Sequence, residues 1–127
     1  MIFQGRFRTV RHKDHAVPVP MPRPLLGHES FLDIRTWKQR DAGAASPTQP
    51  LLLVTTPRKT GTAVYRNRFR RQVRMAFLAY LQTHGCAGWV VWIRPARNAP
   101  PLPTITLRAI EAQLLLALHH LPSLGTP

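Results

Sequence analysis

The chain has 127 residues, of which 44% are apolar, so it has room for one domain with one modest hydrophobic core. Eighteen Lys and Arg residues against five carboxylates give a formal net charge of +13, which favours a polyanionic partner such as nucleic acid. No apolar run approaches the roughly 20 residues of a membrane span, and the single Cys86 cannot form an internal disulfide, so we expect a cytoplasmic protein with no membrane partner.

The N-terminal residues differ in character from the rest of the chain. The first dozen are expected to form a short separate element. The segment 16–24 that follows holds four prolines, which favour an extended connection over a helix or a central strand.

Three later segments have the patterns of β-strands. The segment 31–38 alternates between two sets of side chains, and 51–56 and 89–95 are short apolar runs that are typical of buried strands. The polar, turn-rich segment 39–50 predicts a long hairpin loop between the first two strands. We allow for one further short strand.

Two segments have helical periodicity. In the segment from about Thr62 to Gln82, with Gly85 as a C-terminal cap, one face carries an apolar stripe that we expect to be buried. Its members are Tyr65, Phe69, Val73, Ala76, Phe77 and Tyr80. The segment 104–121 repeats leucine and isoleucine at helical spacing, with Thr104 or Thr106 as the N-cap, and predicts a packing helix.

The other face of the first predicted helix is strongly basic. Five arginines lie between positions 66 and 74, and the sequence has no acidic residue between Asp41 and Glu111. Without acidic neighbours, these like charges repel one another along the helix, which indicates that an anionic partner compensates them. The planar guanidinium fork suits bidentate phosphate contacts, so we interpret this face as an RNA-binding surface with strongly salt-dependent affinity.

The sequence gives little support for catalysis by the protein itself. The five carboxylates, which are Asp14, Glu29, Asp33, Asp41 and Glu111, are scattered and never paired at a spacing that would hold catalytic metal ions. The nearest approach to a metal cluster is His12, Asp14 and His15, whose spacing matches no established site. We expect no catalytic residue and no metal ligand in this chain.

The stretch PRKTGTAVYRNRFRRQVRMAF, residues 57–77, resembles the signature of the bacterial ribonuclease P protein subunit. In that family a strand ends in two basic residues, followed by a glycine, an Ala-Val pair, an Arg-Asn-Arg triplet and further basic residues. The RNA-binding residues that the resemblance implies here are Arg58, Lys59, Arg66, Asn67, Arg68, Arg70, Arg71 and Arg74. The order of elements over about 51–121 also fits the family.

The resemblance implies a fold and a role. The fold is an α/β (α+β) two-layer sandwich of about four strands, with a basic crossover helix in a left-handed βαβ unit, a C-terminal packing helix and a short N-terminal helix. We expect one RNA-binding domain over 1–127, with a variable, proline-rich part at 1–30 and the sandwich at 31–121. The role is that of a non-catalytic subunit of an endoribonuclease holoenzyme, with no obligatory protein partner.

The implied partners are the ribonuclease P RNA and precursor tRNA. In the family the RNA performs the Mg²⁺-dependent removal of the 5′ leader, so the Mg²⁺ is expected to be bound mainly by the RNA partner and the substrate. The family's first helix carries two phenylalanines four residues apart, and Phe3 and Phe7 keep this spacing, although Phe7 with Val10 is an alternative register. Phe31 is a third candidate for leader binding, but Phe31 and Trp37 can equally be core residues.

Two other functions remain open at this stage. One is a general RNA-binding or ribosome-associated protein that uses the same arginine face without a role in tRNA processing. The other is a small metal-dependent nuclease built on the segment 12–15. Dependence of binding on the leader distinguishes the first from a ribonuclease P subunit, and activity without an RNA partner would be required for the second.

Overall fold

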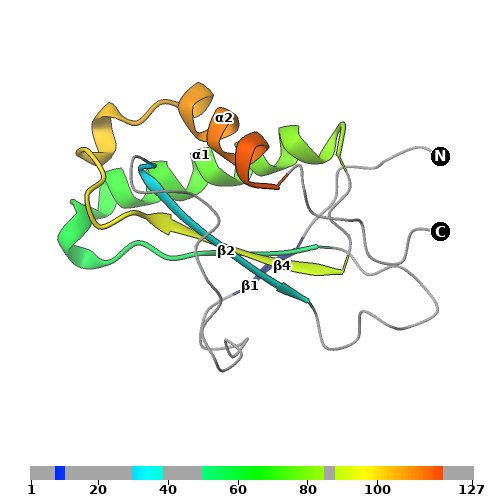
Figure 1. The fold of residues 1–127 in the computed structure, drawn as a ribbon. Helices are drawn as coiled ribbons and strands as arrows, with labels where there is room; N and C mark the ends of the chain where they lie inside the picture. The colour runs from blue at the N-terminus through cyan, green and yellow to red at the C-terminus, as the bar shows by residue number, and fades with distance from the viewer. Residues whose placement is uncertain (1–7, 11–29, 39–49, 85–87, 119–127) are drawn as a thin grey trace.

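The computed structural model describes residues 8–10, 30–38, 50–84 and 88–118. The elements in chain order are β1 (Arg8–Val10), β2 (Leu32–Lys38), β3 (Leu51–Val54), the 3₁₀ turn η2 (Arg58–Thr60), α1 (Ala63–Leu81), β4 (Trp89–Pro95), the 3₁₀ turn η3 (Leu102–Thr104) and α2 (Leu107–Leu118). They form an α+β fold in which both helices lie on one face of a sheet (Figure 1). Within the described ranges, neither helix has the length and apolar character needed to span a bilayer.

Strand β4 lies inside the sheet although it is the last strand in the sequence. It pairs in parallel with β3 on one side and antiparallel with β2 on the other, where the register runs from Leu32 opposite Pro95 to Lys38 opposite Trp89. Strand β1 adds a short parallel ladder to the outer side of β3.

The predicted hairpin between the first two long strands is therefore wrong, because β4 lies between β2 and β3. The four residues Val90 to Ile93 are all buried, so β4 is apolar on both faces and is suited to an inner position. The turn-rich composition of 39–50 predicts a loop but contains no information about which strands pair.

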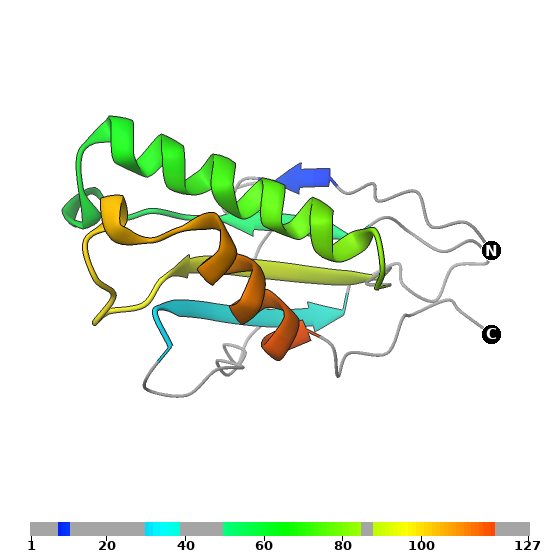
Figure 2. The same cartoon turned by 90° about the horizontal axis from the view of Figure 1, so that it is seen from above.

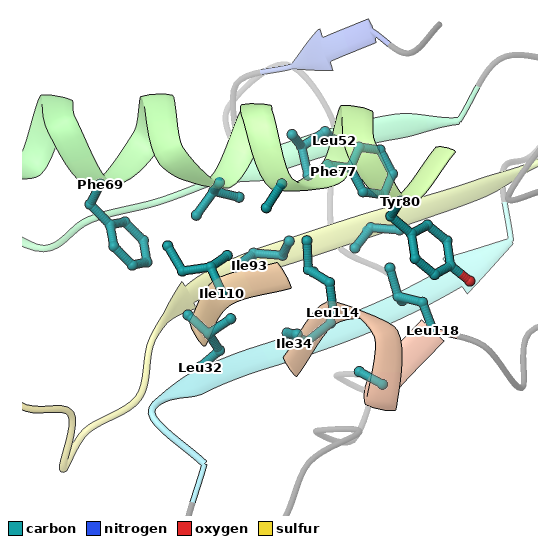
Figure 3. Packing of buried hydrophobic residues seen from close by; sticks show 14 of the residues in the cluster. Leu32, Ile34, Leu52, Phe69, Phe77, Tyr80, Ile93, Ile110, Leu114 and Leu118 are labelled. Carbon is teal, nitrogen blue, oxygen red and sulfur yellow. The ribbon is translucent and has the colours of Figure 1, made fainter. Parts of the chain in front are cut away.

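Both helices lie over one face of the sheet (Figure 2), and the members of the main core come from these two layers. Figure 3 shows side chains from α1, α2 and three strands meeting in this layer. The largest fully buried members are Phe69, Phe77, Leu32, Ile34, Leu52, Leu81, Ile93, Ile110, Leu114 and Leu118. The side chain of Gln113 on α2 ties the helix to the sheet, since its Oε1 accepts from the backbone N–H of Leu32 at 3.2 Å.

A second, smaller cluster lies on the other face of the sheet. Its members are Trp37, Leu51, Leu53, Val90 and Trp92. The two indole rings meet edge to face, with centroids 6.4 Å apart and planes at 87°. Trp37 is thus a core residue, whereas Phe31 is half-buried and packs against the main core.

The predicted helix from about Thr62 to Gln82 corresponds to α1, and the apolar stripe is buried from Phe69 to Tyr80. Tyr65 was expected in the same stripe, but it is 39% exposed. Its turn begins beyond the tip of β4 (Figure 2), so the sheet does not cover it. The prediction for Tyr65 is wrong because periodicity gives the direction of a side chain and not the extent of the surface beneath it.

The last predicted helix corresponds to α2, which begins at Leu107, as expected for the second of the two N-cap candidates. Thr106 is its N-cap, with Oγ1 accepting from the backbone N–H of Ala109 at 3.2 Å. The alternative, Thr104, instead closes η3 by donating from its hydroxyl to the carbonyl of Pro101 at 2.6 Å. The predicted residues after 118 lie outside the described part of the chain.

Several predictions fall on residues that the structure does not describe, including Phe3, Phe7, Gly85 and Cys86. Most of the predicted short N-terminal helix also falls on such residues. Its described residues, Arg8–Val10, form the strand β1 instead. The alternative register with Val10 on a helix is therefore wrong.

Candidate RNA-binding surface

Helix α1 begins where the sequence supplies a cap. The hydroxyl of Thr62 accepts a hydrogen bond from the backbone N–H of Tyr65 at 3.4 Å, which satisfies one of the donors left open at a helix start. The first turn contains no acidic residue, so the positive end of the helix dipole is not neutralised there.

The face of α1 that points away from the core carries most of the predicted RNA-binding residues. Asn67, Arg68, Arg71 and Arg74 are exposed, and Arg66 and Arg70 are half-buried on the flanks. The guanidinium of Arg70 donates from Nη1 to Oδ1 of Asn67 at 3.3 Å, so the two side chains are held together on the surface. The structure thus brings these six residues together on one rigid helix, with the four exposed ones on its solvent side.

Within the part of the chain that the structure describes, no carboxylate forms an ion pair with these arginines. Within the described ranges the only carboxylates are Asp33 and Glu111, and the ion pairs found there join Asp33 to Arg35 and Arg94 rather than to α1. The positive charge of α1 is therefore available to a ligand. Such a surface attracts a polyanion at long range and binds it in a salt-dependent way.

Arg66 differs from its neighbours on the helix. Its Nε is enclosed by protein and has no hydrogen-bond partner in the described structure. An enclosed donor without a partner costs free energy, and native proteins keep few of them. Arg66 is therefore a residue whose hydrogen bonds are incomplete in the free protein.

The 3₁₀ turn η2 extends the basic surface past the start of α1. Arg58 and Lys59 are both exposed on this turn. Gly61, which joins η2 to α1, has a φ of 151°, a backbone conformation that residues other than glycine rarely adopt. The glycine therefore allows the chain to turn so that the two basic residues adjoin the helix.

A family model described as ribonuclease P matches residues 28–117 of the chain, and this range contains η2 and all of α1. The chain belongs to the ribonuclease P protein family. Its role is that of a protein subunit of ribonuclease P, and family membership implies an RNA partner. A comparison with curated protein sequences gave no significant match.

Solved structures of ribonuclease P proteins have the same fold. The protein from Thermotoga maritima has a TM-score of 0.60 at 19% identity, and the comparison covers 77% of this chain and 83% of that one. The same protein in complex with 1-(4-fluorophenyl)-2-thiourea also has a TM-score of 0.60 at 19% identity, covering 76% and 84% of the two chains. The protein from Staphylococcus aureus has a TM-score of 0.52 at 20% identity, covering 68% and 71%.

The ribonuclease P signature did not reveal every charged group near this surface. Asp33 and Arg94 come together only because the register of β2 and β4 places them opposite each other. No local spacing in the sequence indicates that pair. Of the three phenylalanines predicted to bind the leader, only Phe31 lies in the described part, half-buried against the core.

Proposed function

We propose that the exposed face of α1, together with η2, binds the RNA component of ribonuclease P. The observation that carries this proposal is the absence of any acidic partner for the five arginines of α1 within the described structure. Arginine forks bind phosphate oxygens bidentately, and Asn67 adds a donor and an acceptor between them. The core side of the same helix fixes the spacing of these groups, so their backbone loses little conformational freedom on binding.

We propose that the RNA carries the chemistry and that Mg²⁺ is bound mainly by that RNA and by the substrate. The described residues do not fit a magnesium site. Asp33 is already paired with two guanidinium groups, and no group of three metal-binding side chains occurs in the ranges that the structure describes. The protein then contributes neutralisation of phosphate repulsion and placement of the RNA strands.

We propose precursor tRNA as the second RNA, with its 5′ leader near Phe31. This residue immediately precedes β2, and its carbonyl accepts from the backbone N–H of Ala96 at 2.8 Å. Phe31 therefore lies beside the loop that follows β4. A half-buried aromatic ring at such a position can stack with a base, a contact of about 1 to 3 kcal/mol. Phe3 and Phe7 remain predicted leader contacts.

We also infer the left-handed sense of the β3–α1–β4 crossover. In Figure 2 the helices are nearest the viewer and β3 and β4 point the same way. Seen from the helix side and looking in the direction in which both strands run, β4 lies to the left of β3. Almost all parallel crossovers have the opposite sense, so the sense of this one is a distinctive feature.

Reconstitution tests the proposed function. The full chain, added to its ribonuclease P RNA at low Mg²⁺ concentration, is expected to increase removal of the leader from precursor tRNA. The holoenzyme should bind precursor tRNA more tightly than mature tRNA, whereas a general RNA-binding protein would not distinguish them. Cleavage by the protein and Mg²⁺ without the RNA would contradict the proposal and support a protein nuclease.

A further inference from the structure

A groove of about 430 Å³ lies between α1 and α2, which pack side by side over the sheet (Figure 2). On the α1 side it is lined by Ala76 and Ala79, and on the α2 side by Arg108, Ala112 and Leu115. Residues three or four apart on a helix lie on one face, so each wall of the groove is a single ridge of one helix. None of the five arginines of α1 is among the lining residues, so the groove is separate from the arginine face.

The surface at this groove is apolar, although the chain has a net charge of +13. The segments 75–84 and 112–118 contain no Asp, Glu, Lys or Arg. Ala79, Ala112 and Leu115 all line the groove and are all exposed, Leu115 to 46%. Apolar side chains that are gathered at a groove, rather than scattered singly, are typical of a surface that another molecule covers.

Two opposite charges lie on the α2 wall. Arg108 and Glu111 are both exposed, and neither takes part in an ion pair within the described residues. They are three positions apart, so the helix places them next to each other. A molecule that fills the groove therefore meets a cation and a carboxylate side by side, and it needs one group of each sign to match them.

The charges distinguish the possible occupants. Arg108 and Glu111 cancel, so the groove lacks the excess of positive charge that binds a phosphate backbone. A second copy of the chain would bring another net charge of +13 toward the same surface and would be repelled. A protein with a negative net charge is attracted by this field and can also supply apolar side chains.

The shape of the groove fits a helix. Its walls extend over positions 76–84 and 108–115, about two turns or 10 to 12 Å at the rise of an α-helix. Two packed helices offer a groove into which a ridge of a third helix fits, and the small side chains of Ala76, Ala79 and Ala112 allow its backbone to approach. Such a helix presents apolar residues at positions i, i+3, i+4 and i+7.

We propose that the groove between α1 and α2 is a docking site for an acidic, amphipathic helix of a partner protein. The apolar stripe of that helix packs against Ala79, Ala112 and Leu115, one of its carboxylates pairs with Arg108, and one of its cations pairs with Glu111. The inference goes beyond the proposed function, because the ligand is a protein and the arginine face of α1 stays available to RNA.

Two synthetic peptides of equal composition test the proposal with the full chain. Both contain leucine, glutamate and one lysine. The first places its leucines at i, i+3, i+4 and i+7, and the second has the same residues in an order that gives no apolar face. Fluorescence anisotropy at physiological ionic strength should show that the first peptide binds about tenfold more tightly or better. Equal affinities would show a response to negative charge alone and would overturn the proposal.

A matched pair of leucine variants locates the contact. Leu115→Gln and Leu116→Gln are the same substitution at neighbouring exposed positions of α2, but Leu116 does not line the groove. Leu115→Gln should weaken binding of the amphipathic peptide about fivefold or more, and Leu116→Gln by less than about twofold. Ala79→Gln should also weaken it, because the larger side chain enters the groove from α1. Circular dichroism confirms folding, and equal effects of the two leucine variants would contradict the proposal.

RNA titrations and sedimentation equilibrium test the other occupants. Leu115→Gln should bind the ribonuclease P RNA as the wild type does; a loss as large as that for the peptide would assign the groove to RNA and overturn the proposal. The wild type should sediment as a monomer, and a dimer that Leu115→Gln dissociates would assign the groove to a second copy instead. The proposed function fails separately, if the wild-type chain does not support leader removal.

Discussion

Replacing Arg74 by glutamine should stabilise the free protein while it weakens RNA binding. Arg74 is exposed and lies four residues after Arg70 and three after Arg71 on α1, so the helix places it beside two like charges. Each repulsive pair costs about 0.2 to 0.5 kcal/mol, and glutamine has nearly the helix propensity of arginine. The free energy of unfolding should therefore rise by about 0.4 to 1 kcal/mol at low ionic strength.

RNA affinity should change in the opposite direction. Loss of one charge-assisted phosphate contact should weaken binding about tenfold or more, and the slope of log affinity against log salt should become shallower by about 0.9. Urea denaturation of the free protein and RNA titrations at several salt concentrations measure the two effects.

Arg108→Gln is the control for this experiment. Arg108 lies three residues before Glu111 on α2, so its removal ends an attraction instead of a repulsion and should not stabilise the protein. Two results would refute this reasoning: a decrease in stability for Arg74→Gln, or an RNA affinity equal to that of Arg108→Gln. The reasoning is that repulsion between the arginines of α1 lowers the stability of the free protein and that the same arginines bind RNA.

The other predictions concern the elements that hold this surface in place. Arg66→Ala with Asn67→Ala should weaken RNA binding and leave the circular dichroism spectrum unchanged; unfolding of this variant would show that the two side chains are structural. Thr62→Ala removes the N-cap of α1 and should cost about 0.5 to 2 kcal/mol in urea denaturation, with a smaller loss for Thr62→Ser. Phe77→Ala, at a position with no exposed surface, should cost about 3 to 5 kcal/mol. Gly61→Ala should cost about 1 to 3 kcal/mol through backbone strain, because the nearest atoms to an added Cβ are 3.7 Å and 3.8 Å away and do not clash.

The basic helix could be predicted from the sequence because everything that defines it is local. Its buried stripe follows the 3.6-residue period, its cap is the residue immediately before it, and its arginines occupy the remaining positions. Tyr65 was the exception, since its exposure depends on where the sheet ends and not on the helix itself.

The pairing of the strands could not be predicted in this way. Alternation and apolar runs locate β2, β3 and β4, but they do not state that β4 separates the other two. The same limit applies to the ion pair of Asp33 and Arg94, whose side chains meet only through the β2–β4 register.

The inner position of β4 also determines when the protein can fold during its synthesis. β2 and β3 leave the ribosome before β4. They do not pair with each other, so the sheet that contains both can form only when β4 lies between them. A nascent chain that ends before Trp89 lacks the strand with which both β2 and β3 pair, and such exposed strand edges favour aggregation. Pairing of β4 with β2 and β3 is therefore the step that completes the native order of these strands.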